Sequence, residues 1–328
     1  SNISEREFIS GISTNYYYFK AQLNYTPEIN FITKEDLDKT NCYLRNSSKD
    51  YSIIFFTREF IRNLNLSCLN KILGLKALIV TSDRSLKFNE QNQDVLNFDK
   101  QSEYRNLLKY ARSKGSFNSL IIDDKNTLDK GSATKVWEEL EGSTLGSSTS
   151  DGGSNQNLLS KMLLIENSKE RARRLSRALS IQTESIPRRR MDIDSIILTA
   201  SLLTARSLKP ELEYNFGESI SVYLFPNWEM EDFYLDQELD LEKVYLIDLP
   251  WMFNSEIPYL QGLPKKRNRY FALGYDSYDI SLLLNNSFSQ RQFKFNGLSG
   301  QLAYKNGKLY RNSLKVIIQE GMFETIGY

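Results

Sequence analysis

The chain has 328 residues, of which 40% are hydrophobic and 25% are charged, proportions that are typical of a folded soluble protein. This length predicts two domains or one large unit of two lobes. The net charge at pH 7 is only +1, so no global field attracts nucleic acid or an acidic membrane, and a charged partner must be met by a local patch.

The sequence contains no histidine, which excludes Ser-His-Asp and Cys-His catalytic systems and every metal site that uses imidazole. Its two cysteines, Cys42 and Cys68, are too few for a four-thiolate zinc site or a disulfide scaffold. Cys68 is best interpreted as a buried thiol. Whether Cys42 and Cys68 form a disulfide remains open. We expect no cofactor and no metal.

The longest apolar runs have four residues, whereas a membrane-spanning helix needs about 20. The first residues also lack the basic, apolar and small-residue succession of a signal peptide. We therefore expect neither a transmembrane segment nor a signal peptide in this sequence.

The first 141 residues predict helices that alternate with strands. Ser4 and Glu7 have the spacing of a capping box, and apolar residues follow at helical intervals, so a helix is expected at the start with no strand before it. Strands are expected at 29–33, 53–56, 77–81, 95–98 and 120–123, and helices at 58–73, 104–111 and 133–140. This alternation is typical of βαβ units and a parallel sheet.

Residues 142–157 interrupt this pattern. Leu145 is the only strongly apolar residue among Gly, Ser, Thr, Asp, Asn and Gln, and such a composition cannot bury enough surface to order itself. We therefore expect a flexible surface loop over 142–157.

The pattern resumes in the second half. Helices are expected at 158–181, 204–214 and 276–285, and strands at 193–199, 220–224 and 244–247. Near the end, Asn306-Gly307 lies between an alternating strand at 301–304 and a second at 314–318. An Asn-Gly pair between strands is a strong hairpin signal, so the chain is expected to close on an antiparallel hairpin.

No motif for catalysis stands out. The sequence has no nucleophile elbow, no Walker A loop and no dinucleotide-binding fingerprint. The Gly297-Leu298-Ser299-Gly300 segment precedes a strand, so we interpret its glycines as turn residues. Asp192 and Asp194 could act as paired carboxylates, but we favour the interpretation that they neutralise nearby arginines or cap the start of a strand.

The most conspicuous feature is basic. One interpretation is a solvated helix face with local ion pairs, and the other is a docking patch, because the guanidinium group binds carboxylates or phosphates through two hydrogen bonds. Nucleic acid is disfavoured, because few aromatic residues are interleaved for base stacking. The basic residues are Lys169, Arg171, Arg173, Arg174, Arg177, Arg188, Arg189 and Arg190.

These residues also carry a resemblance. The segments RARRL (171–175) and PRRRMDID (187–194) resemble a stretch of the LppC/LpoA family of bacterial outer-membrane lipoproteins. The resemblance covers about residue 158 to the end and is fainter over about 50–141. Further segments similar to the family's motifs, in the same order, are DLPW (248–251), ALGYDSY (272–278) and NGLSGQL (296–302).

The resemblance implies an α/β fold of the type I periplasmic-binding-protein kind, with two lobes of parallel sheets flanked by helices. By element order, lobe one takes residues 1–99 and 245–290, and lobe two takes 100–244 and 291–328. The implied role is non-catalytic: the protein is expected to bind the periplasmic region of a class A penicillin-binding protein and to stimulate peptidoglycan cross-linking. Peptidoglycan is a second candidate contact, and the implied location is the periplasmic side of the outer membrane, through a lipid anchor upstream of this sequence.

Two departures from the family pattern bear on this expectation. The chain starts at a helix cap where family members begin with a strand, which is consistent with a lobe one that lacks its first strand. Phe56-Thr57-Arg58-Glu59 replaces a small-residue loop, of the kind with which solute receptors line their cleft, and this argues against a small-ligand receptor.

Two functions therefore remain, an activator and a periplasmic solute receptor. An activator binds through a surface patch with arginine and aromatic anchors, whereas a receptor encloses a wet cavity between its lobes. The candidate partner-binding residues are Arg188, Arg189, Arg190, Trp228 and Trp251.

Overall fold

The computed structural model describes residues 3–22, 54–56, 77–81, 93–97, 100–125, 127, 130–151, 157–181, 184–215, 217–227, 237–253, 267–285, 292–305 and 308–328. The predicted strand at 29–33 and the predicted helix at 58–73 lie outside these residues, as do Cys42, Cys68 and Trp228.

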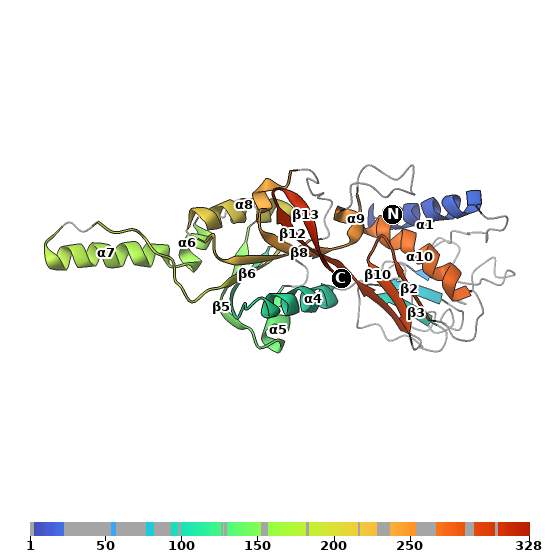
Figure 1. Ribbon diagram of the computed structural model, residues 1–328, viewed down its shortest axis with the longest axis horizontal. Coiled ribbons are helices and arrows are strands. Elements are labelled where there is room, and N and C mark those ends of the chain that lie inside the picture. The colour runs from blue at the N-terminus through green and yellow to red at the C-terminus, as the bar shows by residue number, and fades with distance from the viewer. Residues whose placement is uncertain are drawn as a thin grey trace, which may run out of the picture.

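A seven-stranded sheet forms the centre of one half of the molecule (Figure 1). Its strands follow the order β13-β12-β8-β7-β6-β4-β5. The five strands from β8 to β5 are parallel, and β12 and β13 join as antiparallel neighbours. The strands are β4 (Asn118–Asp124), β5 (Ser143–Ser150), β6 (Ser195–Ala200), β7 (Ser221–Pro226), β8 (Val244–Asp248), β12 (Leu314–Gln319) and β13 (Met322–Gly327).

Helices cover both faces of this sheet. The side chains of Ile121 and Ile197 pack in one cluster with Trp137 of α5, whereas Leu120 and Leu198 pack in a second cluster on the other face. Every residue of β6 is buried, as expected for a strand covered on both faces. The helices of this half are α4 (Lys100–Ser113), α5 (Ser132–Glu139), α6 (Leu158–Met162), α7 (Ile165–Leu179), α8 (Leu202–Tyr214) and the short 3-10 helix η1 (Leu239–Leu241).

The other half contains a parallel sheet of β1 (Ile54–Phe56), β2 (Ala77–Thr81) and β3 (Gln93–Asn97). An antiparallel sheet of β9 (Phe293–Asn296), β10 (Gln301–Lys305) and β11 (Lys308–Asn312) lies beside it, with β11 against β3. The predicted hairpin is confirmed in its first strand, β10, but the second strand is β11. The predicted second strand at 314–318 instead lies in β12 of the seven-stranded sheet. The predicted N-terminal helix is confirmed as α1 (Ile3–Gln22), the first element that the structure describes.

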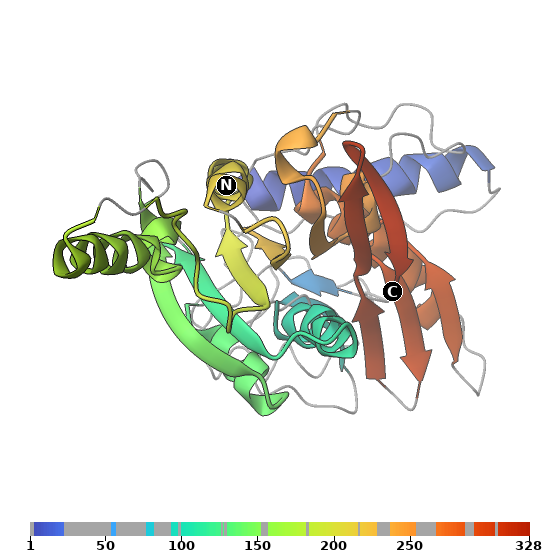
Figure 2. The same ribbon diagram turned by 60° about the vertical axis from the view of Figure 1, so that its left-hand side comes forward.

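Helix α1 packs closely on α10 (Arg269–Asn285) (Figure 2). Gly11 and Gly274 make this approach: a Cβ on Gly11 would lie 2.1 Å from the carbonyl oxygen of Phe271, and a Cβ on Gly274 would lie 2.0 Å from that of Phe8. No residue with a side chain fits at either position without moving a helix backbone.

The described chain passes between the two halves at three places: from β3 to α4, from β8 to α9 (Pro250–Phe253), and from β11 to β12. Buried ion pairs lie at two of these crossings. Asp248 binds Arg269 through both carboxylate oxygens, each 2.9 Å from Nε. Arg311 donates to Glu103 of α4 at 3.1 Å, and Ser313 donates to the same carboxylate oxygen at 2.7 Å.

Two details differ from the sequence prediction. Residues 143–150 form β5, an edge strand paired with β4, so the predicted loop over 142–157 is wrong there. The predicted lobe limits also differ from the sheets: β8 pairs with β7, although 245–290 was assigned to lobe one, and β9 to β11 lie against β3, although 291–328 was assigned to lobe two. The hydrophobic pattern of a strand does not reveal which sheet it joins.

Candidate functional site

An arm extends from the seven-stranded half. It consists of α7 and the returning segment 184–190, and Figures 1 and 2 both show α7 pointing away from the rest of the molecule. Ile165 is the only fully buried residue of α7, so this helix adds almost nothing to the core. We refer to residues 165–190 as the arm.

The ends of α7 explain why it projects. Leu164 before the helix and Ser180 after it both have the left-handed conformation, with φ of 57° and 51°. These residues turn the chain sharply at each end, so the helix does not continue α6 and the chain returns toward the sheet. Two hydrogen bonds tie the returning segment to the base of the arm: the Arg188 N–H donates to Ser168 Oγ at 3.0 Å, and the Arg190 N–H donates to the Leu163 carbonyl at 3.0 Å.

Some of the arm's charges are paired within the helix. Lys169 donates to Glu166 at 2.7 Å, and Arg174 Nε donates to Glu170 at 3.1 Å. Both are exposed pairs at i,i+3 and i,i+4, which contribute a few tenths of a kcal/mol each, roughly 0.2–0.5. The local ion pairs expected for a solvated helix face are therefore present, although they use only part of the positive charge.

The three consecutive arginines have different roles. Arg190 binds Asp192, with Nε 2.7 Å from Oδ1, and this hydrogen bond lowers the pKa of Asp192 and raises that of Arg190. Arg189 donates to the carbonyl of Arg190 at 2.9 Å and to Ser219 Oγ at 2.9 Å. Arg188 is exposed, and its side chain has no ion-pair partner among the described residues.

Asp194 caps the start of a neighbouring strand. Its carboxylate accepts from the N–H of Phe117 at 3.0 Å, from the N–H of Asn118 at 3.0 and 3.1 Å, and from Ser195 Oγ at 2.9 Å. With Asp192 bound to Arg190, the interpretation that the two carboxylates neutralise arginines and cap a strand is confirmed. They are not a catalytic pair.

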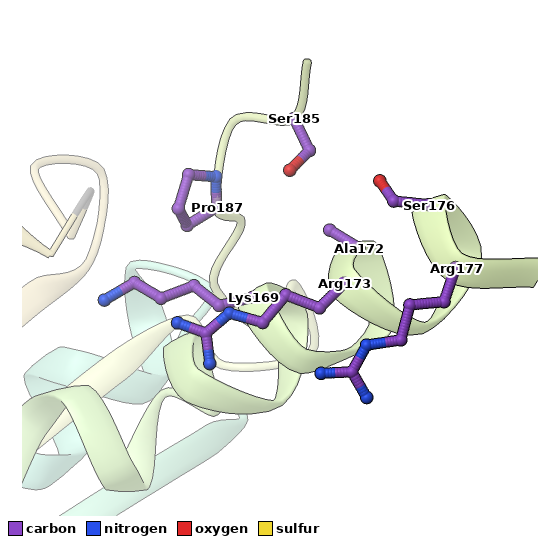
Figure 3. Close-up of a pocket in the computed structure, with 7 residues that line it drawn as sticks. All are labelled: Lys169, Ala172, Arg173, Ser176, Arg177, Ser185 and Pro187. Atoms are coloured by element: carbon purple, nitrogen blue, oxygen red, sulfur yellow. The ribbon is translucent and has the colours of Figure 1, made fainter. Parts of the chain in front are cut away.

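A pocket of about 430 Å³ lies between α7 and the returning segment. Figure 3 shows that the long side chains of Lys169, Arg173 and Arg177 extend from the same side of α7. Arg173 and Arg177 have no ion-pair partner among the residues that the structure describes. The lining residues are Lys169, Ala172, Arg173, Ser176, Arg177, Ser185 and Pro187.

Arg173 and Arg177 were not among the candidate residues predicted from the sequence. The sequence prediction selected the three adjacent arginines at 188–190. The cations that line the pocket, at 169, 173 and 177, are instead four residues apart. The spacing of 169, 173 and 177 could have identified them, because side chains at i and i+4 share one helix face.

One of the two predicted tryptophan anchors, Trp251, does not contribute to this site. Trp251 is 3% exposed, its ring packs 5.6 Å from that of Phe271, and the guanidinium of Arg267 lies 5.2 Å from its ring centre. A buried ring cannot contact a partner, so Trp251 is a core residue. Trp228 lies outside the described residues.

The carboxyl ends of the parallel strands are the place where open α/β sheets bind ligands. Here their polar groups bind one another. Asp124 accepts from the N–H of Ser201 at 3.2 Å and from Thr204 Oγ1 at 3.0 Å, while Thr127 and Asn227 lie 3.3 Å apart. These five side chains and backbone groups therefore stabilise the ends of the strands.

The predicted turn at Gly297–Gly300 is confirmed as structural. The Gly297 N–H donates to the Gly300 carbonyl at 2.8 Å, and the N–H groups of Leu298 and Ser299 donate to the carboxylate of Asp276 at 2.8 and 2.6 Å. Burial raises the pKa of Asp276 to about 6. The turn is thus filled by a side chain of the same protein.

Within the described ranges, no group of three or more His, Cys, Asp or Glu residues is placed to hold a metal ion. No helix in the described part of the chain is both long and apolar enough to cross a bilayer.

Comparisons with known proteins place this architecture. Residues 136–312 match the model of a family described as "LppC putative lipoprotein", and no curated protein matches the sequence. The C-domain of LpoA from Haemophilus influenzae, described as a regulator of PBP1A, superimposes with a TM-score of 0.62 at 14% identity, over 98% of this chain and 95% of that chain.

Two other solved structures show how widely the fold is used. Full-length LpoA from Haemophilus influenzae gives a TM-score of 0.69 at 15% identity, and the match covers 100% of this chain but 57% of that chain. An ABC transporter substrate-binding protein from Desulfitobacterium hafniense in complex with Leu gives 0.55 at 12% identity, over 97% and 95% of the two chains. The present chain therefore spans somewhat more than half of full-length LpoA, and at these identities the likeness shows the fold.

Proposed function

Because this chain belongs to the LppC family, we propose that it is a non-catalytic activator of a class A penicillin-binding protein and acts by direct contact with the periplasmic region of that synthase. The fold is that of the LpoA C-domain over nearly the whole length of both chains, and that protein is described as a regulator of PBP1A. Membership of this family, together with this fold, supports the role of an activator and implies no reaction catalysed by the chain itself.

The arm is the observation that carries this proposal. A helix that buries one residue and displays several arginines is typical of a binding surface, because arginine is one of the residue types enriched among the side chains that supply most interface energy. Such a helix adds little to folding, so its composition is better explained by a partner than by the core.

The family description, a lipoprotein, supports a location in the cell envelope. We place the full-length protein at the periplasmic side of the outer membrane, held by a lipid anchor upstream of this sequence, where it reaches the synthase across the peptidoglycan layer. Peptidoglycan itself remains a second candidate contact.

Reconstitution with a purified class A synthase tests the proposal. The chain is immobilised and offered the periplasmic region of the synthase, and cross-linked muropeptides are then quantified with and without the chain in solution. We expect capture together with a rise in cross-linking. A synthase that neither binds nor responds at micromolar concentrations of the chain would refute the proposal.

The alternative is a solute receptor, which the fold shared with the leucine-bound substrate-binding protein favours. The pairing of polar groups at the strand ends argues against it, because a receptor needs convergent polar groups that are free to bind its ligand. Thermal-shift screening with amino acids, sugars and muropeptides separates the two functions. A ligand that raises the melting temperature in a saturable manner would favour the receptor.

A further inference from the structure

We propose that the pocket between α7 and segment 184–187 is the docking site for an acidic, amphipathic polypeptide segment. This inference deepens the proposed function and rests on it, since the segment would belong to the synthase. It assigns the contact to Arg173, Arg177 and the neighbouring apolar side chains, and not to the adjacent arginines at 188–190.

The first argument is charge segregation. The arm carries eight basic and three acidic side chains, a net charge of +5, whereas the whole chain has +1. The rest of the molecule is therefore net negative. A separated charge of this size orients an acidic partner toward the arm before contact and raises the rate of association.

The second argument is the pairing within the arm. Glu166 and Glu170 are bound to Lys169 and Arg174, whereas Arg173 and Arg177 have no ion-pair partner among the described residues. Like charges at i,i+4 destabilise a helix by about 0.2–0.5 kcal/mol. A carboxylate placed between the two guanidinium groups removes this repulsion and forms charge-assisted hydrogen bonds, which are among the strongest in proteins.

The third argument is the exposed apolar surface of the arm. Large side chains that a folded protein normally covers are exposed on the arm outside the pocket lining, and apolar residues of a docked acidic segment would cover them. They are Leu175 (54% exposed), Leu179 (53%), Ile181 (62%) and Ile186 (77%).

Other occupants fit less well. Residues 165–190 contain no aromatic side chain, and single-stranded nucleic acids bind largely by stacking on aromatic rings. An amphipathic helix can lie on a membrane surface, but the cations here line a pocket with two walls, one from α7 and one from Ser185 and Pro187 (Figure 3). A pocket of this shape accommodates one peptide segment better than it does a flat lipid surface.

Peptide binding to the whole chain tests the inference. The probe is a fluorescein-labelled helical peptide of 20 residues, roughly the length that spans one helical arm, composed of Glu, Leu and Ala with the Leu side chains on one face. Controls are the same peptide with Gln in place of every Glu, and a polyglutamate without Leu. Fluorescence anisotropy gives the dissociation constant.

Two arm variants and one matched control are compared. Arg173→Glu/Arg177→Glu reverses the unpaired cations, and Leu175→Ser/Leu179→Ser removes apolar surface. Lys109→Glu/Lys135→Glu makes the same change in net charge at exposed positions of α4 and α5. Circular dichroism establishes that each variant folds, which we expect because all six side chains are exposed.

We expect the Glu/Leu peptide to bind the wild-type chain and both arm variants to weaken binding about tenfold or more, a change of about 1.4 kcal/mol per tenfold. The lysine control should stay close to wild type. An equal loss of affinity in the lysine control, or equally tight binding of polyglutamate, would show that the arm attracts acidic peptides only through non-specific charge. Either result would overturn the inference. Arm-dependent sedimentation with phosphatidylglycerol vesicles would overturn it in favour of a lipid surface.

The same variants are then offered the synthase. Capture by the wild-type chain that Arg173→Glu/Arg177→Glu abolishes supports the inference. Equal capture by this variant overturns the inference and leaves the activator function standing. If the wild-type chain binds the peptide through its arm but never the synthase, the proposed function fails while the chemistry of the pocket stands.

Discussion

Asp276 and Asp279 on α10 are carboxylates inside the molecule. Burial and, to a smaller extent, the charge of Asp276 raise the pKa of Asp279 to about 7, against the lowering effect of the hydrogen bond from Asn15. The ordinary value for Asp is about 3.8. Between these pH values the folded protein holds a proton that the unfolded chain has released, so the free energy of unfolding falls as the pH rises from about 4 to about 7.

Asp279→Asn should remove much of this dependence, because the amide is neutral at every pH. We expect the variant to be more stable than wild type at pH 8, with a flatter dependence of unfolding free energy on pH, at about 1.4 kcal/mol for each unit of pKa shift removed. Urea denaturation at several pH values measures this. Asp240→Asn at an exposed position is the control, and an unchanged slope in D279N would contradict the assignment.

Asp192 and Asp194 differ in the groups that they bind, although only Ile193 separates them. Asp194→Ala leaves the N–H groups of Phe117 and Asn118 without their acceptor, which should lower the free energy of unfolding by about 2 kcal/mol. Asp192→Ala breaks a largely exposed pair with Arg190 and should lower it by less than about 1 kcal/mol. Chemical denaturation ranks the two, and the reverse order would show that the capping role is misassigned.

At this scale the sequence predicts where the arginines lie better than what each of them binds. The basic segment was evident, yet sequence adjacency does not say which arginines are already bound. Arg190 binds Asp192, as the sequence indicated, whereas Arg189 binds a backbone carbonyl and Ser219. Ser219 was not predictable because it is distant in the sequence.

Among the elements, the contact between α1 and α10 is the most demanding. Gly274→Ala would place a Cβ 2.0 Å from the carbonyl oxygen of Phe8, so the helices must separate. We expect a loss of about 3 kcal/mol, the upper range for overpacking, visible in thermal unfolding and in faster amide exchange of α1. Ser10→Ala, at an exposed position of α1, is the control and should leave the thermal stability and the amide exchange of α1 unchanged. If Gly274→Ala also left them unchanged, the two helices would be able to adjust to the added methyl group.

Helices with strong apolar periodicity and strands with buried runs were predictable, and β5 was not. Its sequence, STLGSSTS, has no apolar alternation, because only part of the strand is buried at the edge of the sheet. Pairing with β4 decides its conformation, which illustrates that strand propensity depends strongly on tertiary context.

Across the whole molecule, the buried pair of Glu103 and Arg311 connects the two halves. Glu103→Gln leaves the Arg311 charge buried and uncompensated, and breaking such a pair is expected to cost about 3–5 kcal/mol. Arg105→Gln breaks an exposed pair between Arg105 of α4 and Glu139 of α5 and should cost at most about 1 kcal/mol. Calorimetry measures both. Small and equal losses of stability in the two variants would show that water and local rearrangement compensate the charge of Arg311 at this crossing.

The way α7 leaves the sheet has a consequence for how this protein can vary. A helix that inserts one side chain into the interior can exchange most of its residues without a folding penalty. Selection on recognition and selection on folding therefore act on separate parts of the chain. An arm transplanted from a relative onto this chain should therefore retain the partner preference of that relative.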